Sequence, residues 1–248
     1  MDVDAYLREL ARRTGAVLGD TLVGAYAGGS YALGAYEQGR SDLDVAVVVA
    51  ERIARGQKEA LVAQLRHESL ACPARGLELV VYSRRAAASP NVAPDFELNL
   101  NTGARMPFRE EFQPDPAEGH WFAIDRSILR RNGIALVGPK PDALFADIPR
   151  QSLLAVIAQS LRWHENGDAE PDDAVLNACR ALRFARTGEW SSKPAAGAWA
   201  LDNGIGSPVV ATALDARSGA GQVRPEAARE FVASALEAVC RGRSSEEA

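Results

Sequence analysis

The sequence predicts an α/β (α+β) domain followed by an all-α helical bundle domain. Three observations lead to this prediction. Up to about residue 140, segments with helical spacing alternate with short apolar runs typical of strands. The segment Gly-Pro-Lys-Pro at 138–141 interrupts that pattern, and from about residue 149 onward every apolar pattern has helical spacing. We therefore place the two domains at residues 1–148 and 149–248.

The elements of the N-terminal domain follow from local patterns. The first is a helix over 3–18, because Tyr6, Leu7 and Leu10 fall on one helical face. Residues 104–119 are rich in Pro and acidic residues, so we expect them to be irregular. The other expected elements are a strand over 21–27, a helix from near Tyr31, strands over 43–49 and 77–82, a helix over 52–69, an edge strand over 96–100, a helix over 121–132 and a strand over 134–137.

The C-terminal domain is predicted to contain helices throughout. Its last helix begins with Pro225, which is pre-organised for a first helical turn, and carries Val232, Leu236 and Val239 along one stripe. The expected helices cover residues 151–165, 173–187, 193–203, 207–218 and 225–241.

Composition is that of an ordinary globular protein. The chain has 248 residues, 47% hydrophobic and 25% charged, with a net charge of −5. It contains no run of basic residues, which argues against nucleic acid as a partner. No apolar run reaches the roughly 18 residues that cross a bilayer, and the N-terminus lacks the pattern of a signal peptide. We expect a cytoplasmic monomer with no membrane partner, whose three cysteines are reduced.

The most informative motif is Gly28-Gly29-Ser30 followed by Asp42-Leu43-Asp44, which leads into an apolar strand. Residues two apart in a strand point the same way, so Asp42 and Asp44 present two carboxylates on one face. Such paired oxygens suit Mg²⁺. The glycines allow a sharp turn close to a ligand, and Ser30 is expected to cap the following helix, directing its N–H groups toward phosphate. The motif therefore predicts a site for a metal-bound nucleoside triphosphate.

A third carboxylate is expected to complete the metal site and to deprotonate the attacking hydroxyl. Glu78 is our choice, because it points away from the apolar neighbours Leu77 and Leu79. Glu97 alternates with Phe96 and Leu98 in the same manner and is the competing candidate. Either glutamate could instead face solvent from an edge strand, which for Glu97 is the favoured interpretation.

With Gly-Ser followed about a dozen residues later by Asp-x-Asp, the chain resembles the DNA polymerase β-like nucleotidyltransferase superfamily. The resemblance implies a nucleotidyltransferase domain with a mixed sheet. It also implies two Mg²⁺ ions and transfer of a nucleoside monophosphate from a triphosphate to an acceptor hydroxyl. The doubled glycine is a small departure from the pattern.

Residues in the C-terminal half of the chain resemble one particular family within this superfamily. Residues 172–200 carry Arg180, Thr-Gly at 187–188, Lys193 and Ala-Trp at 198–199, and look like the helical domain of aminoglycoside adenylyltransferases that modify streptomycin and spectinomycin. The roles that this resemblance implies are metal ligation by Asp42, Asp44 and Glu78, general base for Glu78, nucleotide binding by Gly29, Ser30, Ser41, Arg180 and Lys193, and acceptor binding by Trp163, Asp168 and Asp172.

Residues 163–173 hold five carboxylates and no Lys or Arg beside Trp163, which suits a cationic small molecule. Asp172 has a simpler explanation, because an acid at a helix start stabilises that end. Arg180 could make polar contacts along its own helix, and Lys193 could belong to a loop.

The expected function is Mg²⁺-dependent transfer of AMP from ATP to a hydroxyl of an aminoglycoside or aminocyclitol antibiotic, with release of pyrophosphate. Two alternatives stay open at this stage. One is a nucleotidyltransferase that acts on a protein or another small molecule. The other is a non-catalytic nucleotide-binding module.

Overall fold

The chain forms two compact units, Met1–Ile148 and Pro149–Ala248, in a computed structural model that describes residues 2–115, 119–166 and 169–244. None of the described helices is both long and apolar enough to cross a membrane.

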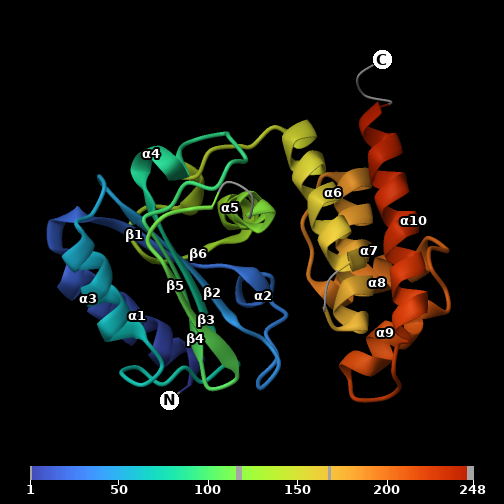
Figure 1. Ribbon diagram of the computed structural model, residues 1–248, viewed down its shortest axis with the longest axis horizontal. Helices are drawn as coiled ribbons and strands as arrows, with labels where there is room; N and C mark the ends of the chain where they lie inside the picture. The colour runs from blue at the N-terminus through green and yellow to red at the C-terminus, as the bar shows by residue number, and fades with distance from the viewer. Residues whose placement is uncertain (1, 116–118, 167–168, 245–248) are drawn as a thin grey trace. The chain divides into compact units, whose positions relative to one another are not determined.

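The N-terminal unit is built on a six-stranded sheet with the strand order β5-β4-β3-β2-β1-β6 (Figure 1). Strands β2 and β3 pair in parallel and the other neighbours pair antiparallel, so the sheet is mixed. The expected fold class is confirmed. The strands are β1 (Leu22–Ala27), β2 (Leu43–Val49), β3 (Leu77–Ser83), β4 (Leu98–Gly103), β5 (Met106–Glu111) and β6 (Ile134–Val137).

Helices cover both faces of this sheet, with α1 and α3 on one side and α5 on the other (Figure 1). The expected helix over 52–69 is shorter, because its last turn stops at Leu65. The helical segments of the unit are α1 (Val3–Leu18), η1 (Gly19–Thr21), α2 (Gly29–Ala32), α3 (Arg55–Leu65), α4 (Arg84–Ala87), α5 (His120–Asn132) and η2 (Pro141–Ala143).

Alternation along the central strands divides the apolar residues between two cores. In β2, Val45, Val47 and Val49 pack with α1 and α3, whereas Ala46 and Val48 pack on the opposite face with Tyr82. Successive side chains of a strand point to opposite faces, which explains why β2 is apolar along nearly its whole length. Each fully buried Val or Leu contributes roughly 1.5–3 kcal/mol through removal from water.

Two sequence predictions about the far edge of the sheet are wrong. Residues 104–119 are not irregular throughout, because they include β5. The strand expected over 96–100 runs over Leu98–Gly103, and it is not an edge strand, since β5 covers its outer side. Strand β5 is largely exposed and rich in charged residues, so it lacks the apolar alternation that marks a half-buried strand.

Helix α5 is held against the sheet by a buried arginine. The guanidinium of Arg126 donates hydrogen bonds to the backbone carbonyls of Ala86, Ser89 and Asn91. Phe122 of the same helix packs against Phe96, with ring centroids 4.9 Å apart. These contacts fix the wall of the cavity described below.

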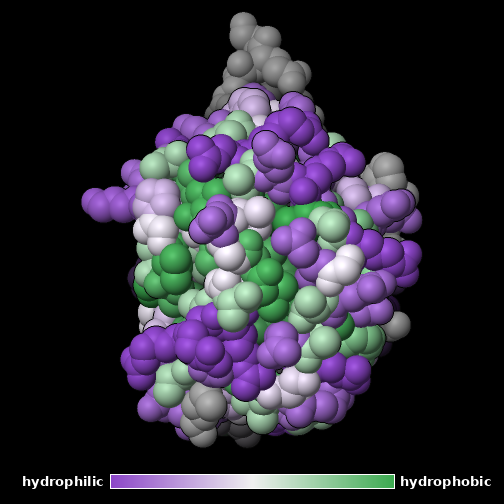
Figure 2. Space-filling model, turned by 90° about the vertical axis from the view of Figure 1, so that its left-hand side faces the viewer, coloured by the Kyte–Doolittle hydropathy of each residue, from purple (hydrophilic) through white to green (hydrophobic). Residues whose placement is uncertain are grey.

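Figure 2 views the N-terminal unit from its left-hand side in Figure 1 and shows hydrophobic residues exposed between hydrophilic rims.

The C-terminal unit contains helices, in agreement with its apolar pattern. Val175, Leu176 and Cys179 on α7 are buried in its core together with Ala196 and Val210. The helices are α6 (Arg150–Asn166), α7 (Pro171–Thr187), α8 (Lys193–Asp202), α9 (Val209–Arg217) and α10 (Pro225–Ser244).

Glu97 is buried and ion-paired, so the expectation that it faces solvent is wrong. Its Oε2 lies 3.0 Å from Nζ of Lys58, and its side chain is only 7% exposed. Arg52 approaches the other carboxylate oxygen at 3.7 Å. Strand β5, which the sequence analysis missed, pairs with β4 from Asn99 onward, so the strand that follows Glu97 is not the edge of the sheet.

We predict that Lys58→Met destabilises the fold by about 3–5 kcal/mol, because it leaves the Glu97 carboxylate buried without its closest cation. Urea unfolding measures this change. The double variant Lys58→Met/Glu97→Gln should recover most of it. Arg55→Met is the matched control, since the exposed Arg55–Glu59 pair contributes less than about 1 kcal/mol. Equal stability of Lys58→Met and wild type would contradict this assignment.

Candidate active site

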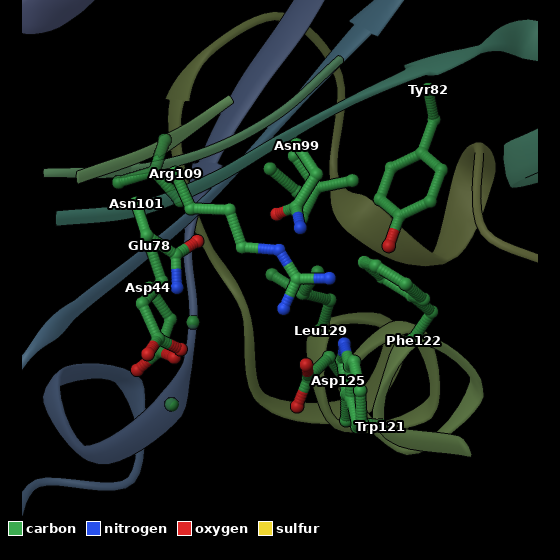
Figure 3. A pocket seen from close by; sticks show the side chains of 15 residues that line it. Asp44, Glu78, Tyr82, Asn99, Asn101, Arg109, Trp121, Phe122, Asp125 and Leu129 are labelled. Carbon is green, nitrogen blue, oxygen red and sulfur yellow. The ribbon is translucent and has the colours of Figure 1, made fainter. Parts of the chain in front are cut away.

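A row of polar side chains crosses four neighbouring strands at one level. Asp44 of β2 is the register partner of Glu78 on β3, Glu78 that of Asn101 on β4, and Asn101 that of Arg109 on β5. Register partners point to the same face and lie about 5 Å apart. Figure 3 shows the carboxylates of Asp44 and Glu78 side by side, with Asn101 and Arg109 next to them. We call these four residues the polar row.

The glycine turn fits closely over the first member of this row. The N–H of Gly28 donates to the backbone carbonyl of Asp44 at 2.8 Å. Gly29 has φ of +50°, and a Cβ at this position would lie 1.6 Å from Oδ2 of Asp44. A side chain therefore has neither the backbone conformation nor the space at residue 29.

Ser30 is not the helix cap, so this sequence prediction is wrong. Helix α2 begins at Gly29, with Gly28 in the N-cap position and no side-chain cap hydrogen bond. The helix therefore starts two residues earlier than expected. Ser30 therefore lies within the first turn of α2, and its side chain does not occupy the N-cap position.

Burial and nearby negative charge both act on the carboxyl group of Glu78. The pKa of Glu78 is raised to about 8, first by burial and then by the negative charges of Asp44, Asp42 and Asp125, against the lowering effect of Arg75. Two carboxylates at adjacent strand positions repel each other, and a divalent ion between them removes that repulsion. The donor set of Asp44 and Glu78 therefore fits a hard cation such as Mg²⁺.

Asp42 is ion-paired with Arg75. Arg75 holds both of its carboxylate oxygens, with Nε to Oδ1 at 2.7 Å and Nη2 to Oδ2 at 2.5 Å. Both residues precede strands that pair in parallel, so the two side chains meet at the same sheet edge. Among the described residues, no group of three or more His, Cys, Asp or Glu side chains is arranged to hold a metal ion. Asp42 could act as a metal ligand only after its carboxylate leaves Arg75.

A cavity opens over the polar row, between the sheet and α5 (Figure 3). Its floor comes from β2 to β5 and its wall from α5. The lining residues are Gly28, Gly29, Asp44, Val45, Ala46, Glu78, Val80, Tyr82, Asn99, Asn101, Arg109, Trp121, Phe122, Asp125 and Leu129. Glu97 is not among them, whereas Glu78 lies near the centre of the row.

The sequence analysis missed most of the polar groups that line this cavity. Asn99 and Asn101 alternate with the buried Leu98 and Leu100, a pattern that places both amides on the face of Glu78. That alternation could have indicated them. Arg109 and Asp125 stand in segments with no comparable signal, because their approach to the site depends on how β5 and α5 pack.

The hydroxyl of Ser41 accepts a hydrogen bond from the N–H of Glu37 at 3.0 Å, and its carbonyl accepts one from the N–H of Arg75. Ser41 is buried and closes the loop before β2. These contacts describe a residue that shapes the approach to Asp42.

The remaining predicted site residues belong to the C-terminal unit. Arg180 donates to the carbonyl of Ser191 at 3.0 Å and to the side chain of Asn177 at 3.2 Å. Nζ of Lys193 lies 3.0 Å from Asp173. Trp163 is 51% exposed at the end of α6, and Asp172 is in the first turn of α7. Asp168 lies outside the described residues.

Comparisons with known proteins agree with this geometry. A family model described as "Aminoglycoside adenylyltransferase, C-terminal domain" matches residues 143–241, and one described as "Nucleotidyltransferase domain" matches residues 7–82. The chain belongs to the aminoglycoside adenylyltransferases of the nucleotidyltransferase superfamily. The resemblance stated from the sequence is thereby confirmed, and the chain is an enzyme of the nucleotidyltransferase class.

Individual aminoglycoside adenylyltransferases are distant relatives. Spectinomycin 9-adenylyltransferase from Staphylococcus aureus is 26% identical over 190 residues, which are 75% of this chain and 73% of that protein. Aminoglycoside (3'') (9) adenylyltransferase from Rhizobium radiobacter is 27% identical over 171 residues, 65% of this chain and 62% of that protein.

A solved structure shares the fold of this adenylyltransferase. It is spectinomycin adenyltransferase from Enterococcus faecialis with ATP and spectinomycin, which superposes with a TM-score of 0.73 at 19% identity. The match covers 96% of this chain and 100% of that chain.

We predict that Gly29→Ala abolishes nucleotide binding in this adenylyltransferase, because the methyl group would collide with the Asp44 carboxylate. Gly34→Ala is the matched control, since Gly34 also has positive φ (+66°) but nothing within 4 Å of the added Cβ. It should lose only about 1–2 kcal/mol of stability from backbone strain. Titration calorimetry with ATP and Mg²⁺ measures binding, and thermal unfolding measures strain. Retained ATP affinity in Gly29→Ala would contradict the close fit.

Proposed function

We propose that this enzyme transfers AMP from ATP to a hydroxyl of an aminoglycoside or aminocyclitol antibiotic, with spectinomycin or streptomycin as acceptor. The observation that carries the proposal is the Asp44–Glu78 pair on adjacent parallel strands beneath the glycine turn. Relatives named as spectinomycin 9-adenylyltransferase and aminoglycoside (3'') (9) adenylyltransferase support the acceptor class.

The reaction follows from the positions of the chain's own groups. The phosphates of ATP would lie at Gly29 and Ser30, with the α-phosphorus above Asp44. Glu78 takes the proton of the acceptor hydroxyl, whose oxygen attacks the α-phosphorus. The new O–P bond forms as the bond to the β-phosphate oxygen breaks, and pyrophosphate leaves with that electron pair. A base must lie within hydrogen-bond reach of the attacking hydroxyl, which the central place of Glu78 allows.

Mg²⁺ is part of the proposal, with Asp44 and Glu78 as its ligands and Asp42 as a third once it parts from Arg75. When bound, such an ion supplies positive charge that stabilises the leaving pyrophosphate and the crowded carboxylates. Arg180 and Lys193 are proposed to contact the triphosphate, and Trp163, Asp168 and Asp172 to bind the acceptor.

The direct test is incubation of the purified enzyme with ATP, Mg²⁺ and either spectinomycin or streptomycin. Pyrophosphate release, together with mass spectrometry of the antibiotic, should show one added AMP. Absence of product with a broad panel of aminoglycosides would overturn the acceptor class. Addition of AMP to lysate proteins instead would indicate a protein acceptor.

We predict that Glu78→Gln lowers kcat by about 10²–10⁴-fold, because the general base and a metal ligand are lost together. Its melting temperature in EDTA should equal or exceed that of wild type, because the amide does not repel Asp44. The two measurements separate a catalytic role from a structural one. A large fall in melting temperature would show that Glu78 chiefly supports the fold.

A further inference from the structure

Arg75 holds the carboxylate of Asp42, and the reaction proposed above gives this arginine no task of its own. We propose that Arg75 is an exchangeable counter-ion, which occupies Asp42 until a metal-bound triphosphate arrives and then moves to the polyphosphate. Metal and nucleotide would therefore bind together, whereas metal alone would bind weakly. This inference rests on the proposed function, because it takes Asp42 and Asp44 as ligands of the metal.

The contact engages both oxygens of the carboxylate. Nε of Arg75 donates to Oδ1 of Asp42 at 2.7 Å, and Nη2 donates to Oδ2. This is the two-pronged arrangement in which a guanidinium binds a carboxylate most strongly. A metal ion would need the same oxygens, and its charge would be repelled by that of the arginine. Arg75 and a metal therefore compete for Asp42.

The backbone that carries Arg75 is fixed beside Asp42. The N–H of Arg75 donates to the carbonyl of Ser41 at 3.1 Å, and the N–H of Leu43 donates to the carbonyl of Gly76 at 2.9 Å. These two hydrogen bonds lie on either side of Asp42 in the sequence, so they hold the two segments together at this point. An exchange of partners therefore takes place through rotation of the Arg75 side chain and not through movement of its loop.

The exposure of the Arg75 side chain allows that rotation. It is 48% exposed and the side chain of Asp42 is 19% exposed, whereas the side chains of the Lys58–Glu97 pair are 12% and 7% exposed. Water competes for the charges of an exposed ion pair, so such a pair stabilises the fold little, while a buried pair is costly to break. The Arg75–Asp42 pair is therefore exchangeable and is poorly explained as a support of the fold.

A polyphosphate can accept the hydrogen bonds that Asp42 gives up. A guanidinium binds phosphate with the same fork that it offers to a carboxylate, and a triphosphate carries more negative charge than one carboxylate. In the proposed complex the metal joins Asp42 to phosphate oxygens, so phosphate lies beside the carboxylate that Arg75 leaves. Metal alone brings no such acceptor and would displace Arg75 without giving it a new partner. This difference couples metal binding to nucleotide binding.

The test compares Arg75→Met with wild type in two binding measurements that need no acceptor. Electron paramagnetic resonance of free Mn²⁺ measures metal affinity without nucleotide, and calorimetry measures the affinity for an equimolar mixture of Mn²⁺ and ATP. Arg75→Met should bind Mn²⁺ alone about fivefold or more tighter, because the competing cation is gone. It should bind Mn²⁺–ATP about threefold or more weaker, because the polyphosphate loses its guanidinium. Arg75→Lys keeps the charge and should lie between the two proteins in both measurements.

Arg105→Met is the matched control, since Arg105 is an exposed arginine whose backbone N–H donates to the carbonyl of Arg75 at 3.3 Å. Its guanidinium donates to the backbone carbonyl of Gly39 at 2.6 Å, so the variant removes a nearby charge and leaves Asp42 paired. Both affinities should change by less than about twofold, because salt and water screen an exposed charge.

The two measurements must move in opposite directions for the exchange to hold. Weakening of both affinities in Arg75→Met would indicate a structural role and overturn the inference, and so would two affinities equal to those of wild type. If wild type transfers AMP to no tested antibiotic, the proposed function fails, while opposite shifts of the two affinities would still support the exchange.

Discussion

The site depends on the parallel pairing of β2 with β3, which places Asp44 directly beside Glu78. Two ionised carboxylates at adjacent strand positions repel each other, and burial adds to the cost, as the raised pKa of Glu78 shows. The surrounding core holds them there. Val45, Val47 and Leu79 are buried between the sheet and the helices α1 and α3, so the register cannot slip without exposing that entire face.

The second constraint is the space above Asp44. Only a residue without a side chain fits at position 29, because the carboxylate of Asp44 occupies the volume that a Cβ would need. The close approach brings the backbone of the turn next to the Asp44 carboxylate, which is one of the proposed metal ligands. In the proposed function, the turn would bind phosphate and the neighbouring carboxylates would bind the cation, so both would meet at one location.

The elements that a local sequence pattern determines were predicted, whereas the elements that depend on packing between distant segments were missed. Strands β2 and β6 were predicted at the observed residues, since the apolar run of β2 and the stop signal after Val137 are local. The Asp44–Glu78 pair could also be predicted from the sequence, because alternation in β3 turns Glu78 away from Leu77 and Leu79. Strand β5 was missed, since its charged, exposed residues gain their conformation from pairing with β4. Without β5 the approach of Arg109 could not be inferred, and the burial of Glu97 depends on its ion pair with the distant Lys58.

The three carboxylates near the glycine turn are compensated in different ways. Asp42 has a protein cation, Arg75, on both of its oxygens, whereas Asp44 and Glu78 face each other. If Arg75 were aimed at Glu78 instead, the pair would be neutralised permanently and would have little remaining attraction for a metal-bound triphosphate. By pairing with Asp42, Arg75 limits the total negative charge at this end of β2 and β3. In the proposed function, binding of a metal nucleotide would relieve the repulsion between these two carboxyl groups, which is why the reaction is proposed at this end of β2 and β3.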